Sequence, residues 1–182
     1  MAGMKSRTAT MLALTVAGVF SAPPKVNAAV MTVSNTLQAH IQANGSLSVP
    51  GTTTLSNTGT LFTSFSGSLT VQYRARSTST GGGTLTLKVT QDFQTGGPSV
   101  SRGDLTYSCG AAGLGTACSS ATASTTSATA VVTLPSSACT GGGTPCSATD
   151  PNSVPVTFTL ADQPVDKTGT YTANVQFTIS AT

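Results

Sequence analysis

Apolar and polar residues alternate along several stretches of this chain, as expected when each strand turns one face to a core and the other to water. The longest regular example is residues 171–179, where Tyr171 begins a series of apolar residues at every second position. The same alternation occurs at residues 33–43, 69–76, 85–90 and 154–160, and a shorter apolar stretch occupies residues 131–134. Turn residues separate these stretches at Asn44-Gly45, Pro50-Gly51, Gly81–Gly83 and Asp166–Gly169.

This pattern predicts an all-β fold, because residues 29–182 contain no sustained helical period. Short strands joined by turns are typical of an antiparallel β-sandwich, for which we expect about seven to nine strands. Residues 108–150 depart from the alternation with a segment rich in cysteine, glycine and serine, which we interpret as long loops around the short strand at 131–134. We therefore expect residues 29–182 to form a single β-sandwich domain.

Residues 1–28 have the composition of a secretory signal peptide. Lys5 and Arg7 are basic, residues 11–20 are largely apolar, and small residues precede the expected cleavage site before Ala29. The apolar segment is shorter than a membrane span, which needs roughly 20 apolar residues, so no span is predicted. We expect the processed chain to be secreted, and to act outside the cell, at its surface or in the periplasm.

Removal of this leader also removes the net charge. Lys5, Arg7 and Lys25 are three of the eight basic residues, so five basic residues and five aspartates balance in residues 29–182. A balanced chain gives no electrostatic reason to bind nucleic acid, and no nucleic-acid partner is predicted.

The four cysteines are expected to form disulfides, because an exported chain matures in an oxidising compartment. Four cysteines allow three pairings, and sequence alone leaves all of them open. We favour Cys109–Cys118 and Cys139–Cys146, since each pair closes a local loop that contains glycine. Their spacing is wider than that of zinc-binding cysteine pairs, so no metal site is predicted.

Residues suited to catalysis are scarce. His40 is the only histidine and falls on the polar face of the 33–43 stretch. Asp150, Asp162 and Asp166 lie in turn-like contexts, where aspartate is common without any catalytic role. Asp150 with Asn152, or Asp162 with Asp166, offers oxygen atoms of the kind that bind calcium. We predict no catalytic, cofactor-binding or metal-binding residues, no cofactor, and a protein that is not an enzyme.

Three short motifs have structural interpretations that we prefer to functional ones. Arg102-Gly103-Asp104 spells a cell-adhesion tripeptide, and Gly-Asp is also ordinary turn material. Asn44-Gly45-Ser46 matches a glycosylation acceptor and also fits a hairpin turn. Arg74 and Arg76 share the outer face of one predicted strand, where solvation is expected.

The stretch at residues 33–43 begins close to the expected start of the processed chain. A terminal strand of this kind pairs within its own domain or adds to an open sheet edge in a neighbouring molecule. Val33, Leu37, Ala39 and Ile41 are the expected anchors in the second arrangement. The sequence alone leaves both arrangements open.

Residues 169–179, with the sequence Gly-Thr-Tyr-Thr-Ala-Asn-Val-Gln-Phe-Thr-Ile, resemble the closing strand of bacterial secreted β-sandwiches. These include spore coat protein U-like pilus subunits and other fimbrial subunits. The resemblance implies an immunoglobulin-like or pilin-like sandwich that assembles into fibres. Such pilins usually bridge their early strands with a disulfide, whereas here no cysteine precedes Cys109.

These observations predict an exported, non-catalytic structural subunit of a bacterial surface fibre, pilus or extracellular matrix. Its expected partners are copies of itself or other surface proteins. The alternative is a secreted module that binds carbohydrate or a surface such as ice, because paired threonines repeat on the outward faces of two stretches (Thr84 with Thr86, Thr157 with Thr159). In that case the partner is a glycan or a solid surface.

Overall fold

The computed structural model describes residues 38–39, 41–57, 59, 61–140 and 150–182. The chain divides into two compact units, residues 1–39 and 40–182, and the second of these is described below. The predicted signal peptide and its cleavage site lie outside the described residues.

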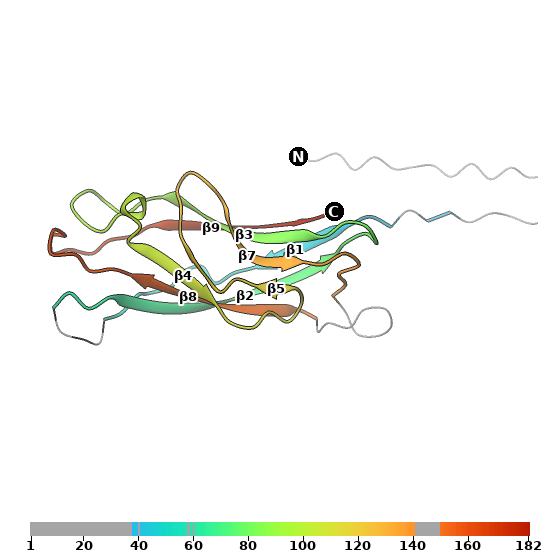
Figure 1. Ribbon diagram of the computed structural model, residues 1–182, viewed down its shortest axis with the longest axis horizontal. Coiled ribbons are helices and arrows are strands. Elements are labelled where there is room, and N and C mark those ends of the chain that lie inside the picture. The colour runs from blue at the N-terminus through green and yellow to red at the C-terminus, as the bar shows by residue number, and fades with distance from the viewer. Residues whose placement is uncertain (1–37, 40, 58, 60, 141–149) are drawn as a thin grey trace, which may run out of the picture. The chain divides into compact units, whose positions relative to one another are not determined.

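Two antiparallel sheets make up the domain (Figure 1). The first has the order β1-β2-β8-β4-β6 and the second the order β5-β7-β3-β9. The strands are β1 (Asn44–Ser48), β2 (Phe65–Arg76), β3 (Gly83–Gln91), β4 (Leu105–Cys109), β5 (Thr116–Ala117), β6 (Ser120–Thr122), β7 (Thr129–Leu134), β8 (Asn152–Leu160) and β9 (Asn174–Ala181), with one short 3₁₀ turn, η1 (Val100–Arg102). The predicted all-β, antiparallel sandwich is confirmed.

Alternation along the long strands builds the core. In β2, Val71 and Tyr73 are buried whereas Gln72 and Arg74 are exposed, and β8 follows the same rule from Val154 to Leu160. Each strand therefore turns one apolar face to the space between the sheets, where burial of about 25 cal/mol per Å² of apolar surface stabilises the fold.

A β-bulge explains the one apolar stretch that does not alternate. Leu85 of β3 pairs with Val132 of β7, but the next residue, Thr86, pairs with Ala130, so Val131 is the extra residue. Both Val131 and Val132 are fully buried. An extra residue shifts the alternation by one, so two consecutive valines face the core.

Some predicted boundaries are wrong. Residues 38–39 and 41–43 lie outside any strand, and Asn44-Gly45 opens β1 instead of forming a turn, because these residues pair with the end of β2. The last strand begins at Asn174, since Tyr171 is used in the preceding loop, where its hydroxyl donates to the Lys167 carbonyl over 2.7 Å.

Residues 108–140 are also less irregular than predicted. The end of β4, β5, β6 and a longer β7 lie within this range, whereas we expected loops around residues 131–134 alone. Threonine, serine and alanine are ambiguous in sequence, and here their backbone groups complete the edges of both sheets.

The order of the described strands is that of an immunoglobulin-like sandwich in which none of them fills one position. That fold arranges strands A to G as A-B-E-D and C-F-G. Here β1, β2, β8 and β4 occupy the A-B-E-D positions, β3 and β9 occupy C and F, and β5 to β7 are inserted between the fourth and fifth strands. Among the described strands none occupies the G position, on the side of β9 away from β3.

The connections place different loops at the two ends of the sandwich (Figure 1). At what we call the arm end, β1 begins beside the end of β2, and β9 ends beside the start of β3. At the opposite end, called the Arg102 end, β2 begins beside the end of β8, and β9 begins beside the end of β3. The loops at 57–64, 92–104 and 161–173 lie at the Arg102 end.

Candidate functional site

The core is incompletely covered along β9. In the ladder between β3 and β9, Leu87 lies opposite Phe177 and Val89 opposite Val175. Leu87 and Val89 are fully buried, whereas Phe177 and Val175 remain partly exposed although they point to the same side of the same sheet. Exposure of the inward face of an edge strand shows that the sandwich is open on this side. We call this opening the β9 seam.

β1 covers only part of the seam. It is five residues long and pairs with the last five residues of β2, from Gln72 to Arg76. β1 approaches β9 closely, since a Cβ atom built on Gly45 would lie 3.1 Å from Cγ2 of Ile179. The two strands are nevertheless edges of different sheets, with no ladder between them.

Beyond β1 the chain leaves the edge of β2 and returns at a single bridge between Ser56 and Ser66. A shallow groove of about 500 Å³ lies here, lined by residues 50 and 52–54, Ser68–Thr70 of β2, and Pro155. Val49 and Leu55 from this irregular segment pack partly buried against the core. One short strand and one irregular segment therefore cover the side of the domain beside β9 only in part.

The opposite side is closed covalently. Cys109 at the end of β4 and Cys118 just after β5 form a disulfide, which links the two sheets and confirms this predicted pair. Cys139 is disulfide-bonded as well. Cys146 lies outside the described residues, so the Cys139–Cys146 pairing remains a prediction.

Of the predicted strand-complementation anchors, the described residues include Ala39 and Ile41. We call residues 29–43, which precede β1, the arm. Ala39 and Ile41 are exposed and lie outside any strand, and the relative accessibility of Ile41 is 69%. Val33, Leu37 and His40 lie outside the described residues. In the described part of the arm, no residue belongs to a strand, so neither of the two arrangements left open by the sequence is decided.

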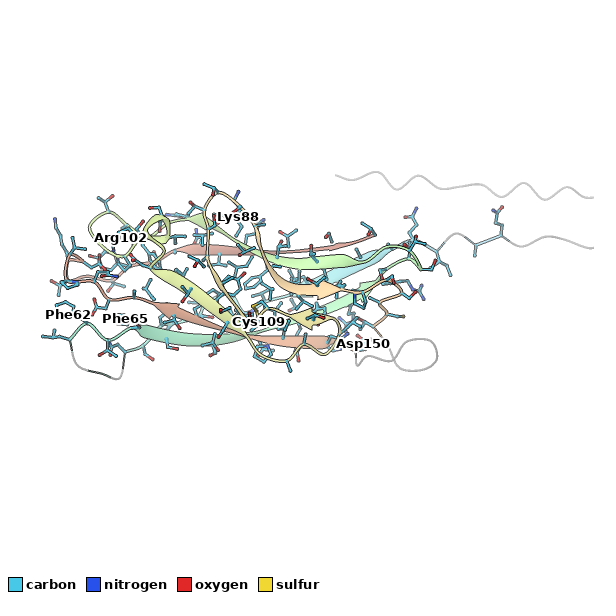
Figure 2. The ribbon with its side chains drawn as sticks, in the orientation of Figure 1. Phe62, Phe65, Lys88, Arg102, Cys109 and Asp150 are labelled. Carbon is cyan, nitrogen blue, oxygen red and sulfur yellow. A yellow bond between two sulfur atoms is a disulfide. The ribbon has the colours of Figure 1, made fainter. Side chains whose placement is uncertain are left out.

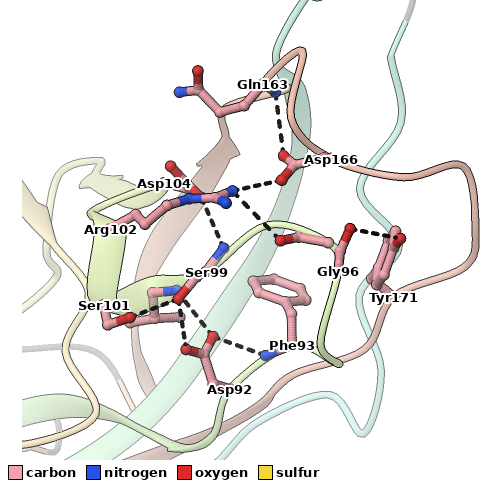
Figure 3. A network of polar contacts seen from close by, with 12 residues as sticks. Asp92, Phe93, Gly96, Ser99, Ser101, Arg102, Asp104, Gln163, Asp166 and Tyr171 are labelled. Atoms are coloured by element: carbon pink, nitrogen blue, oxygen red, sulfur yellow. Dashed lines mark hydrogen bonds and ion pairs between the residues drawn. The ribbon is translucent and has the colours of Figure 1, made fainter.

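The adhesion-like tripeptide is internal structure. The Asp104 carboxylate is buried and accepts hydrogen bonds from the Ser99 backbone N–H at 2.7 Å and from Nε of Arg102 at 2.8 Å (Figure 3). Arg102 also forms an ion pair of 2.6 Å with Asp166. Gly103 ends η1 with a positive φ of 82°, a conformation that favours glycine. The preferred turn interpretation is confirmed.

Asp92 anchors the same network. Burial alone would raise the pKa of its carboxyl, but hydrogen bonds from the backbone N–H groups of Val100 and Phe93 and from the Ser99 hydroxyl outweigh burial and lower that pKa. The hydrogen-bonded carboxylates of Asp104 and Asp166 raise the pKa of Arg102. These contacts link the loop at 92–104 to the loop at 161–173. Each charged side chain named in this network is hydrogen-bonded within it.

The remaining sequence candidates are dispersed. The Arg74 side chain is exposed, as predicted for a solvated face, and it also forms an ion pair with Asp150. Asn152 is fully buried in β8, whereas the Asp150 side chain is half exposed. The Asn152 amide donates to Thr140 at 2.8 Å, and its Oδ1 atom has no hydrogen-bond partner among the described residues. Asp162 lies in the loop after β8.

Serine and threonine form rows across the outer face of the five-stranded sheet. Registered pairing aligns two such rows, Ser66-Thr159-Thr106-Thr122 and Ser68-Thr157-Ser108-Ser120. The Ser68 and Thr157 hydroxyls are 2.9 Å apart. The Thr157 and Thr159 pair is visible in the sequence but the rows are not, because strand order aligns residues that are distant in the chain.

No helix within the described residues is long and apolar enough to cross a membrane. In the same part of the chain, acidic, histidine and cysteine side chains do not gather in threes around a metal position. Comparisons with protein-family models, curated proteins and solved structures find no match to this chain.

Proposed function

We propose that this protein is an exported, non-catalytic structural subunit of a bacterial surface fibre, pilus or extracellular matrix, assembled from copies of itself by β-strand complementation. In this arrangement the arm of one copy adds to the free edge of β9 in the next. The observation that carries the proposal is the β9 seam, where Val175, Phe177 and Ile179 are paired on one side only and remain partly exposed.

An added strand satisfies two requirements of the seam. Its backbone extends the hydrogen-bonded ladder beyond β9, and alternate side chains complete the apolar layer between the sheets. The arm has the required period, because Val33, Leu37, Ala39 and Ile41 have one parity and Ser34, Thr36, Gln38 and Gln42 the other. The exposure of Ala39 and Ile41 favours an anchor role between molecules.

The resemblance of residues 169–179 to the closing strand of spore coat protein U-like and fimbrial subunits supports the same proposal. Those residues include β9 up to Ile179, the strand whose outer edge is vacant. Export by a cleaved leader, and an oxidising destination, fit the disulfide between Cys109 and Cys118.

The test uses the natively secreted chain and substitutions of opposite parity in the arm. Leu37→Asp and Ile41→Asp place a charge on the anchor side, while Gln38→Asp and Gln42→Asp place the same charge on the other side. Negative-stain microscopy and size-exclusion chromatography measure assembly. We expect filaments from the unmodified chain and the glutamine variants and monomers from the anchor variants. Unmodified chain that stays monomeric on concentration refutes the proposal.

A second candidate function, a module that binds carbohydrate or ice, is favoured by the two hydroxyl rows on the five-stranded sheet. Paired strands are about 4.8 Å apart, so each row repeats hydroxyls at a regular interval on a face that carries no charge along these rows. Thr157→Lys, with Thr133→Lys on the other sheet as control, tests it. A loss of glycan-array binding or ice-recrystallisation inhibition in the first variant alone supports this function.

A further inference from the structure

Asn44 and Gly45 form the one Asn-Gly pair in the chain, and the structure places this pair at the start of β1 instead of in the predicted hairpin turn. β1 is the outer strand of the five-stranded sheet, and both residues are exposed. An Asn-Gly pair is reactive because glycine has no Cβ atom, so its backbone nitrogen approaches the preceding asparagine side chain without obstruction. The reaction needs both groups to be free of other partners.

The Gly45 N–H lies outside the ladder between β1 and β2. The backbone N–H of Ala75 donates to the Thr140 hydroxyl at 2.9 Å, and its carbonyl accepts from the Thr140 N–H at 2.9 Å. Both polar groups of Ala75 therefore point away from β1, and its register partner Gly45 belongs to a non-hydrogen-bonded pair. The Gly45 N–H then faces the outer edge of β1, where no described strand pairs with it.

The side-chain amide of Asn44 is equally free. Among the described residues it forms no hydrogen bond. The amides of Asn57, Asn152 and Asn174 each donate one. Asn152 is also fully buried, and none of these three is followed by glycine. Asn44 is therefore the one described asparagine that combines an unrestrained amide, an accessible position and a glycine neighbour.

Packing explains why glycine stands at position 45. A Cβ atom built there would lie 3.1 Å from Cγ2 of Ile179 in β9, closer than ordinary van der Waals contact. Alanine or a larger residue would require Ile179 to move. The close approach of β1 to β9 thus keeps the reactive pair in the chain.

We propose that Asn44 is a modification site, at which the exported protein deamidates without an enzyme. The Gly45 backbone nitrogen gives up its proton to water and bonds to Cγ of Asn44, while the side-chain nitrogen takes up a proton and leaves as ammonia. The product is a five-membered succinimide. Water then opens the ring at one of its two carbonyl carbons, which yields aspartate or isoaspartate at position 44. One water is consumed and one ammonia is released, with no oxidant or reductant, and the reaction does not depend on the proposed function.

The aspartate product gains an ion-pair partner. Asn44 lies in register with Arg76, which has no ion pair among the described residues. Arg74, on the same face of β2, already pairs with Asp150 at this end of the domain (Figure 2). A carboxylate at position 44 faces Arg76 across the ladder, and opposite charges in that arrangement attract. This product therefore keeps β1 in place.

The isoaspartate product has the opposite effect. Its main chain runs through the former side chain and is one carbon longer before Gly45, so position 44 no longer fits the register. β1 makes its hydrogen-bonded pairs with β2 at Asn44, Ser46 and Ser48, and the first of these is lost. The arm joins β1 at this residue, so isoaspartate loosens the base of the arm as the protein ages.

Mass spectrometry of the secreted chain tests the modification. The folded chain, the Asn44→Gln variant and a synthetic peptide of residues 41–48 are incubated in mildly alkaline buffer, digested and compared over time. We expect the segment with Asn44 to gain one mass unit and to separate into two products. Its rate should lie within about tenfold of the peptide's rate, because the Gly45 N–H is free in the fold. The segments with Asn152 and Asn174 should stay unchanged, and so should position 44 in Asn44→Gln, whose longer side chain closes a ring more slowly.

A folded chain that keeps its Asn44 amide under conditions in which the peptide loses it would overturn the proposal. Ser46→Ala separates a second explanation, since Asn44-Gly45-Ser46 also matches a glycosylation acceptor. This variant removes the acceptor and should deamidate like the parent. A parent chain that carries a glycan on Asn44, and that deamidates only after Ser46→Ala, would likewise count against the proposal.

Hydrogen exchange measures the effect on β1. The Asn44→Asp variant carries only the aspartate product, whereas aged protein contains both. We expect the Arg76 amide to exchange about tenfold faster in the isoaspartate fraction of aged protein than in Asn44→Asp, because its ladder partner is lost. The Leu69 amide, which pairs with β8, should be unchanged. Equal exchange at Arg76 would overturn the loosening of the arm and leave the modification itself standing.

Discussion

Two valines that face each other across one ladder offer a direct measure of how open the β9 seam is. Val89 of β3 and Val175 of β9 are paired in register and point to the same side of the sheet. Val89 is fully buried, whereas Val175 remains partly exposed. Substitution of each by alanine removes the same two methyl groups, so the chemistry is matched and only the surroundings differ.

The expected losses of unfolding free energy follow from how deeply each valine is buried. Loss of two buried methyl groups costs about 1.6 kcal/mol in transfer free energy, and the cavity left in a closed core raises the loss of unfolding free energy for Val89→Ala to about 2–3 kcal/mol. Val175 already contacts water, and water fills the space that its methyl groups leave. We therefore expect Val175→Ala to cost about 1 kcal/mol or less in the monomer.

Urea unfolding of the full secreted chain, followed by far-ultraviolet circular dichroism at a concentration that keeps it monomeric, measures both costs. In assembled material the difference should disappear, because the arm of a neighbour would then cover Val175. Equal losses of unfolding free energy in the monomer would mean that the seam is closed within one molecule, and would refute the reasoning on which strand complementation depends.

Three further predictions concern other parts of the fold. Replacement of both Cys109 and Cys118 by serine should lower the unfolding free energy by about 2–3 kcal/mol, measured by urea unfolding against the oxidised parent. Asp104→Ala should cost about 2–3 kcal/mol in the same assay, because it leaves the Ser99 N–H without its buried acceptor, whereas an exposed adhesive aspartate would tolerate the change without loss. The lowered pKa of Asp92 means that its ionised form adds stability above its ordinary value of 3.8, and that this stability is lost as pH falls through the lower native pKa. The melting temperature of Asp92→Asn should therefore fall less steeply with decreasing pH than that of the parent below about pH 4. Parallel pH curves would contradict the stabilising role of ionised Asp92.

The fold class and the buried faces of the long strands can be read from the sequence. Alternation in residues 69–76, 85–90 and 154–160 identified the buried side of β2, β3 and β8, because a strand repeats every two residues whatever its partners are. The spacing of Cys109 and Cys118 also indicated their disulfide. These features are local, so each can be recognised within one short segment of the chain.

The consequences of strand pairing follow from the folded structure alone. Among the described strands, the strand order leaves the position beside β9 vacant and aligns the hydroxyl rows from four strands. It also places the apolar residues 61, 62 and 165 at the end opposite Ile41. The burial of Asp104 and the shortness of β1 are equally invisible in sequence, since both depend on contacts between distant segments. Period-two alternation indicates which side of a strand is apolar. The pairing of strand edges determines which apolar side is left uncovered, and that pairing exists only in the folded chain.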